Sequence, residues 1–346
     1  MLNDSIMRPR SVNNRPVNYA IGALLTALLI GSVAPRSTAQ GKPMVVVTTA
    51  LLCDVTKQIA QDTVDLKCLV AAGSDPHTYQ IKTDDRKAIE TAKLVLYSGY
   101  DFEPQLTKAI TTSSNPAPKI AIHEIAVPTP QTFEEDGKTE TDPHVFHNAA
   151  HGVEITKAVK QHLIALQPNQ TKLYNENADK LSNELNQIHT WIKSQVATIP
   201  MAQRKLVTTH DAFGYYSKAY DIPVIGALQG LSTEEQPTAK RVAELVKEIK
   251  SSKVPTIFVE MTASPKLLKA VAKESNVKVA EQELFADGIG ESGSVAETYS
   301  KMLISNTKTI VIGLGGKFTE FKLNAAPQAS KLQPSPARVL VGSAIW

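Results

Sequence analysis

The feature that most constrains the fold is one long helical pattern in the middle of the chain. From residue 170 to about residue 198, apolar side chains recur at three- and four-residue spacing, at Leu173, Ala178, Leu181, Leu185, Ile188, Ile192 and Val196. At 1.5 Å per residue, such a helix would be about 40 Å long. It is isolated between two α/β halves and is longer than a typical domain helix, so we expect it to join two lobes rigidly.

The segments on either side of this helix alternate between strand-like and helical patterns. Apolar or β-branched runs predict strands near 44–48, 64–70, 94–98 and 119–122, and then near 205–208, 224–227, 256–259 and 277–280. Helical patterns occupy 51–61, 149–166, 237–250, 265–274 and 294–314. This order implies an α/β fold with two lobes, each with a mostly parallel sheet flanked by helices.

The predicted organisation has five parts. They are a signal peptide over 1–39, an N-terminal α/β lobe over 41–168, a linking helix over 169–199, a C-terminal α/β lobe over 200–316 and a tail over 317–346. The polar, acidic stretch 128–143 predicts a mobile surface loop. The tail shows no clear periodicity, so we expect it to be poorly ordered.

The N-terminus has the composition of a signal peptide. Three arginines precede an apolar run over 19–33, which is short for a membrane span but typical of a signal-peptide core. Residues 37–39 (STA) offer small side chains at a cleavage site, so the mature chain would begin near Gln40. An uncleaved N-terminal anchor is the alternative.

The end of this apolar run resembles a bacterial lipobox that lacks its cysteine. Ser32 follows Leu29-Ile30-Gly31 at the position where a lipoprotein has the lipidated cysteine. Without that thiol no thioether-linked lipid can form, and no later stretch is long and apolar enough to span a bilayer. We therefore expect a soluble periplasmic protein in a Gram-negative-type envelope.

The two cysteines, Cys53 and Cys68, both lie in the exported part. In an oxidising compartment we expect them to form a disulfide, and closing a loop of 15 residues would contribute about 3 kcal/mol. Both positions lie toward the same edge of the predicted sheet, which makes a bridge feasible. Two buried thiols are the alternative.

Charge and aromatic content argue against a polyanion partner. The formal net charge is +3, and Lys and Arg are spread through the chain alongside Asp and Glu. Aromatic residues make up 5%, too few for a stacking platform on single strands. We expect no nucleic-acid partner.

Side chains that bind metals follow several predicted strands, at the edge where open α/β sheets bind ligands. The candidates are His77, His144, His210 and Asp287. Two come from each half, so the four can converge in a cleft between lobes. Three imidazoles and one carboxylate suit Zn²⁺, Mn²⁺ or Fe²⁺. Taken singly, a histidine after a proline is more often a surface or capping residue, so position alone leaves that interpretation open.

Five short motifs occur in one order with one spacing. They are 75–79 (DPHTY), 142–146 (DPHVF), 208–213 (TTHDAF), 216–220 (YSKAY) and 284–288 (LFADG). Over about residues 42–316, the pattern resembles the zinc- and manganese-type periplasmic solute-binding proteins of ABC transporters. The resemblance implies two α/β lobes joined by one rigid helix. It also implies that a transported divalent metal binds between the lobes, to His77, His144, His210 and Asp287, and passes to a membrane permease.

Some sequence features favour Mn²⁺ as the bound metal, and others favour Zn²⁺. The loop before the second motif is short, acidic and without histidine, unlike the His-rich loop of zinc-type members. Segment 231–237 (LSTEEQP) resembles cyanobacterial manganese-type members, whereas His210 favours zinc because some manganese-type members have glutamate there. Phe146 also departs from the tryptophan that is often found at its position. We expect Mn²⁺, with Zn²⁺ a close second, as cargo rather than as a catalytic cofactor.

Segment 147–151 has the histidine spacing of a metalloprotease helix. Asn148 stands where the glutamate that acts as general base would be, so a hydrolase is not favoured. We expect His147 and His151 to be exposed on the first turn of a helix, where they would assist metal capture. Other histidines fall on ordinary strand or helix positions and are expected to be structural: His123, His162 and His189.

The chain has no Walker loop, no Gly-x-Gly-x-x-Gly opening a helix and no Gly-x-Ser-x-Gly elbow. We expect a monomeric receptor without catalysis. A metal-dependent hydrolase, which needs an open coordination position, is one alternative. An adhesion or scaffold protein with a structural metal is the other.

Overall fold

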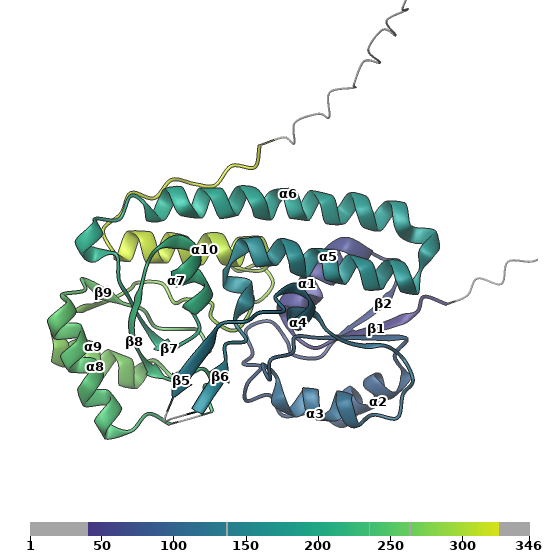
Figure 1. Ribbon diagram of the computed structural model, residues 1–346, viewed down its shortest axis with the longest axis horizontal. Helices are drawn as coiled ribbons and strands as arrows, with labels where there is room; N and C mark the ends of the chain where they lie inside the picture. The colour runs from purple at the N-terminus through teal and green to yellow at the C-terminus, as the bar shows by residue number, and fades with distance from the viewer. Residues whose placement is uncertain (1–40, 136–137, 235, 263, 325–346) are drawn as a thin grey trace, which may run out of the picture. The chain divides into compact units, whose positions relative to one another are not determined.

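The computed structural model describes residues 41–324, apart from 136–137, 235 and 263 (Figure 1). The predicted signal peptide, its lipobox-like segment and tail residues 325–346 lie outside the described residues. Within the described part, no helix is long and apolar enough to cross a membrane.

The first half contains a parallel four-stranded sheet with strand order β2-β1-β3-β4. Its strands are β1 (Met44–Val47), β2 (Asp65–Cys68), β3 (Leu94–Tyr97) and β4 (Lys119–Ala121). Its helices are α1 (Ala50–Ala60), α2 (Thr83–Thr91), α3 (Pro104–Thr112) and α4 (Ile122–Ala126). Side chains of β1 point alternately to two cores, Val45 and Val47 toward α1 and Val46 toward α2 and α3. Because β1 is buried on both faces, its sequence is an unbroken apolar run.

The second half repeats the parallel pairing. Strand β7 (Leu206–His210) pairs with β8 (Val224–Gln229), and β9 (Thr256–Ile257) pairs with β10 (Lys278–Val279). The amide N of Phe258 donates to the carbonyl O of Val207 at 2.9 Å, which places β9 beside β7. The helices are α7 (Gly214–Tyr220), α8 (Ala239–Ser252), α9 (Pro265–Ser275) and α10 (Tyr299–Gly313). Parallel strands flanked by helices confirm the predicted α/β class.

The central helical pattern forms α6 (Thr171–Val196), a helix of 26 residues. It follows α5 (Ala149–Leu166) through the short 3₁₀ turn η2 (Pro168–Gln170). Helix α6 packs against α1 of the first half and α10 of the second, and Figure 1 shows it running above α5 and α10. The buried side chains of α6 include six of the seven apolar positions that predicted it, from Ala178 to Val196. One amphipathic helix therefore contacts elements of both halves.

The predicted surface loop over 128–143 contains a hairpin instead. Strands β5 (Thr132–Glu135) and β6 (Lys138–Thr141) are antiparallel, with Thr132 opposite Thr141 and Phe133 opposite Glu140. The pattern did not show this hairpin because Phe133 is the only apolar side chain in either strand. Backbone pairing and β-branched threonines form the ribbon without a hydrophobic face.

The first part of the predicted disordered tail is held against α6. Trp191 Nε1 donates to the carbonyl O of Thr319 at 3.1 Å, and the amide of Thr319 donates to Gln195 Oε1 at 2.8 Å. The rings of Phe318 and Phe321 lie edge-on to Trp191, with centroids 5.8 and 5.7 Å away. Residues 317–324 are therefore ordered, contrary to the expectation for the tail. Phe318 and Phe321 pack against Trp191 and hold a segment that has no helical or strand periodicity.

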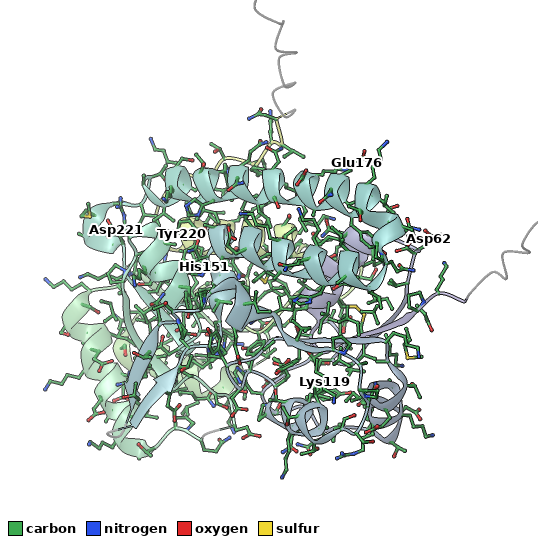
Figure 2. The ribbon with its side chains drawn as sticks, turned by 45° about the vertical axis from the view of Figure 1, so that its right-hand side comes forward. Asp62, Lys119, His151, Glu176, Tyr220 and Asp221 are labelled. Atoms are coloured by element: carbon green, nitrogen blue, oxygen red, sulfur yellow. A yellow bond between two sulfur atoms is a disulfide. The ribbon has the colours of Figure 1, made fainter. Side chains whose placement is uncertain are left out.

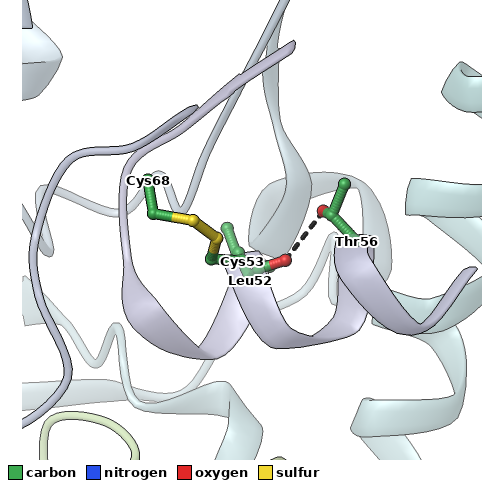
Figure 3. The surroundings of a disulfide bond; sticks show 4 residues. All are labelled: Leu52, Cys53, Thr56 and Cys68. Carbon is green, nitrogen blue, oxygen red and sulfur yellow. Dashed lines mark hydrogen bonds between the residues drawn. A yellow bond between two sulfur atoms is a disulfide. The ribbon is translucent and has the colours of Figure 1, made fainter. Parts of the chain in front are cut away.

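Cys53 in α1 and Cys68 at the end of β2 form a disulfide, as predicted, with Cα atoms 5.9 Å apart (Figure 3). Both residues lie near the carboxyl edge of the sheet. The bridge therefore ties the first helix to the edge strand.

Removing this disulfide should destabilise the chain. For a closed loop of 15 residues, we expect the double variant Cys53→Ala with Cys68→Ser to lose about 3 kcal/mol of unfolding free energy, because its unfolded chain is less restricted. Urea denaturation of the metal-free protein measures the loss, and the reduced native chain is the matched control. Equal urea midpoints for the variant and the oxidised native chain would contradict this expectation.

Candidate metal centre

Two Asp-Pro-His sequences form the same local turn on the first-half side of the centre. Asp75 Oδ1 accepts the amide N–H of His77 at 2.9 Å, and Asp142 Oδ1 accepts that of His144 at 2.9 Å. Such a turn fixes the backbone of the residue two positions after the aspartate. Each motif therefore orients one imidazole toward the centre.

The second-half side begins at the carboxyl end of β7. There the amides of Thr209 and His210 donate to Glu260 Oε1 at 3.0 and 3.2 Å. On the loop after residue 284, the hydroxyl of Thr262 donates to Asp287 Oδ2. That bond leaves Oδ1 of Asp287 as the oxygen that faces the imidazoles.

The four predicted ligands come together, with one donor atom each within 4.8 Å of the others. His144 Nε2 lies 3.3 Å from His77 Nε2 and 3.4 Å from His210 Nε2. Asp287 Oδ1 lies 3.4 Å from Nε2 of both His77 and His144, and 3.1 Å from that of His210. Four donors placed tetrahedrally at about 2.1 Å from an ion would be about 3.4 Å apart. The five separations above are close to that value, and all four donor atoms lie within 4.8 Å of one another.

Carboxylates behind two of the rings set their protonation. His144 Nδ1 is 2.9 Å from Asp142 Oδ1, and His210 Nδ1 contacts Glu260 Oε2. Because the carboxylate accepts a hydrogen bond from Nδ1–H, the Nε2 of each neutral ring carries a lone pair that points to the centre. Lone pairs and a carboxylate oxygen that face one another in a water-excluded space repel, so the arrangement requires a cation.

The electrostatics agree with a site that binds positive charge. Burial would raise the pKa of Asp287, but the charge of His210 and hydrogen bonds from the imidazoles hold it well below its usual value. Burial would lower the pKa of His210, yet the carboxylates of Glu260 and Asp287 raise it well above 6.5. The pKa of His144 is raised as well, since Asp142 and Asp287 outweigh its burial. The centre can therefore take up positive charge, either as a metal ion or as protons.

Sequence reasoning missed the side chains that support the ligands. Glu260 follows the predicted strand 256–259, so its place at a strand end was a usable signal. Thr262 gave no such signal. Phe102 also lines the centre, with its ring edge-on to His77 and His144 at centroid distances of 5.0 and 5.3 Å.

His147 does not lie where we expected it. It ends the 3₁₀ turn η1 (Val145–His147), is fully buried, and donates from Nε2 to the carbonyl O of Ala286 at 2.8 Å. His151 does lie on the first turn of α5 (Figure 2), but it is half-buried and its Nδ1 is 3.2 Å from the carbonyl O of Val145. The predicted pair of exposed histidines is wrong, because the ring of Phe213, which is distant in sequence, packs against His147.

The model of the family described as "Zinc-uptake complex component A periplasmic" matches residues 45–313. The chain belongs to this family. Its members are solute-binding proteins, which confirms the expected class and excludes an enzyme.

Individual relatives agree in fold over most of the chain. The zinc-binding protein TroA of Treponema pallidum is 33% identical over 295 residues, which cover 84% of this chain and 95% of TroA. A solved structure of TroA has a TM-score of 0.75 and covers 79% of this chain and 99% of its own. The manganese ABC transporter substrate-binding lipoprotein PsaA of Streptococcus pneumoniae (strain ATCC BAA-334 / TIGR4) is 29% identical over 299 residues, which cover 84% of this chain and 96% of PsaA. The two-lobe α/β architecture expected from the motifs is therefore shown.

His123 should make the fold sensitive to acid. It is 1% exposed in α4, near the rings of Phe102 and Phe146, and burial lowers its pKa to about 3. The unfolded chain takes up this proton near pH 6.5, so the unfolding free energy falls as pH drops from about 6.5 toward 3. We expect His123→Phe to lose less stability between pH 7 and pH 4.5 than the native chain.

Urea denaturation in the presence of a chelator measures this difference, because metal binding has its own pH dependence. His162→Phe is the control, since His162 is half-exposed on α5 and less buried than His123. An equal loss of stability in the native chain and His123→Phe would show that His123 is not an acid-sensitive group.

Proposed function

We propose that this chain captures a divalent transition-metal ion outside the cytoplasm and delivers it to the membrane permease of an ABC importer. The proposed ligands are His77, His144, His210 and Asp287. The observation that carries the proposal is the convergence of three buried imidazole nitrogens and one carboxylate oxygen from four distant segments. Membership of a family of solute-binding proteins supports delivery to a transporter.

Zn²⁺ and Mn²⁺ are the proposed cargo. The acidic loop favours Mn²⁺, whereas the three imidazoles and the tetrahedral separations favour Zn²⁺. The relatives are divided in the same way, since TroA is described as zinc-binding and PsaA as a manganese transporter component. Competition between the two ions, followed by elemental analysis of protein purified from its own periplasm, decides between them.

A receptor explains the coordination better than the two alternatives. Four protein donors fill a tetrahedral shell, and a hydrolytic centre would keep one position for water. A scaffold protein with a structural metal would unfold when the metal is removed. We propose that this chain releases its metal reversibly and keeps its fold, because the apolar cores of the described residues are built from side chains other than the four ligands.

We propose that the mature protein is soluble in the periplasm after cleavage near Gln40. The support is the signal-peptide composition and Ser32 in place of a lipidated cysteine. Relatives such as PsaA are described as lipoproteins, so this chain would differ from them in its attachment. Mass spectrometry of the mature N-terminus tests the cleavage and the absence of lipid.

Removing single ligands should abolish tight binding without unfolding the chain. We expect Asp287→Ala and His210→Ala each to weaken Zn²⁺ and Mn²⁺ binding at least tenfold, because three donors cannot complete the shell. Titration calorimetry measures the affinity, and the melting temperature of the metal-free variants checks their fold.

The matched control is His162→Ala, which removes an imidazole on α5 that lies outside the centre. Its affinity should equal that of the native chain. Native affinity in both ligand variants would show that the metal binds elsewhere.

A further inference from the structure

His147 connects the segments that carry two of the proposed histidine ligands. It lies three residues after His144, in the turn that follows that ligand. Its ring stacks on Phe213, with centroids 4.4 Å apart and planes 27° apart, and Phe213 lies three residues after His210. Both rings are fully buried, so the two segments pack directly against each other.

His147 also contacts the segment of the fourth ligand. Its Nε2 donates to the carbonyl O of Ala286, the residue before Asp287. The preceding residue, Phe285, is held by Asn306, which accepts its amide N–H at 2.9 Å and donates to its carbonyl at 2.8 Å. The backbone is therefore restrained at two successive residues directly before the carboxylate.

The hydrogen bond between His147 and Ala286 lies where water cannot replace it. Ala286 is 1% exposed, so a carbonyl that lost this donor would be buried without a partner. Such a loss is costly compared with the loss of an exposed hydrogen bond. Burial lowers the pKa of His147 to about 3, and the neutral ring carries its proton on Nε2 because the carbonyl can only accept.

We propose that His147 is a positioning residue that fixes Asp287 relative to His144 and so slows release of the bound metal. This inference rests on the proposed function, since it takes Asp287 and His144 as ligands. His147 is not itself a ligand through Nε2, because that atom donates to Ala286. Its effect is transmitted through the backbone of residues 286 and 287.

Two substitutions separate the hydrogen bond from the packing. His147→Phe keeps an aromatic ring against Phe213 but has no donor for Ala286. His147→Gln carries an amide N–H that can reach the same carbonyl. We expect Zn²⁺ to leave the Phe variant about tenfold faster than the native chain, and the Gln variant less than threefold faster.

Stopped-flow transfer of Zn²⁺ from the full chain to a chromophoric chelator measures release. Association should stay native in both variants, because all four proposed ligands are unchanged. His162→Phe is the matched control, since this half-exposed imidazole on α5 lies outside the centre, and its release rate should stay native. If His147→Phe does not fold, His147→Met supplies a buried side chain without a donor.

Native release rates in the Phe variant, or equal acceleration in the Phe and Gln variants, would overturn the inference. The second outcome would mean that packing matters and the hydrogen bond does not. Asp287→Ala is measured in parallel. Native affinity in Asp287→Ala would contradict the proposed function, whereas weak binding there with native release in His147→Phe would contradict only the role of His147.

Discussion

Four electron-rich atoms that face one another in a buried space are the constraint on which the centre depends. Three imidazole nitrogens and one carboxylate oxygen, with five of their six separations between 3.1 and 3.4 Å, repel unless a cation lies between them. Polar groups around the centre orient these four atoms. Asp142 and Glu260 fix two rings with their lone pairs inward, and Thr262 holds one oxygen of Asp287 aside.

The candidate ligands lie at the ends of secondary-structure elements and in turns. His210 ends a buried strand, and two Asp-Pro-His turns aim His77 and His144. The backbone at these positions is fixed by hydrogen bonds to Asp75, Asp142 and Glu260, and Phe102 packs edge-on against the rings of His77 and His144. Helix α6 packs against α1 of the first half and α10 of the second, and so connects the two halves that supply these ends.

The helices and strands were predictable from the sequence because a buried face places apolar residues at regular spacing. The runs at 44–48 and 94–98 became central strands, and the helical spacing after residue 170 became α6. The hairpin β5-β6 was missed because backbone pairing formed it without a hydrophobic face. Residues 317–324 were missed because their order depends on Trp191, which is distant in sequence.

The candidate ligands were predicted from motif order, and the structure brings all four together. Their supporting residues were harder to predict, because a hydrogen bond between residues 139 positions apart leaves no local pattern. His147 shows most clearly what a local sequence pattern cannot predict. Its spacing from His151 suggested an exposed pair, whereas its environment is set by Phe213 and Ala286.

The bond from Thr262 to Asp287 bears on which ions can compete in a cell. With Oδ2 bonded to Thr262, Oδ1 is the oxygen of Asp287 that faces the imidazoles, so the proposed ligands would offer three nitrogens and one oxygen. Mg²⁺ and Ca²⁺ require six or more donors, mostly oxygen, and Mg²⁺ gives up its water reluctantly. At the proposed site, donor number and donor type would therefore disfavour the most abundant divalent ions, even where they greatly outnumber the cargo.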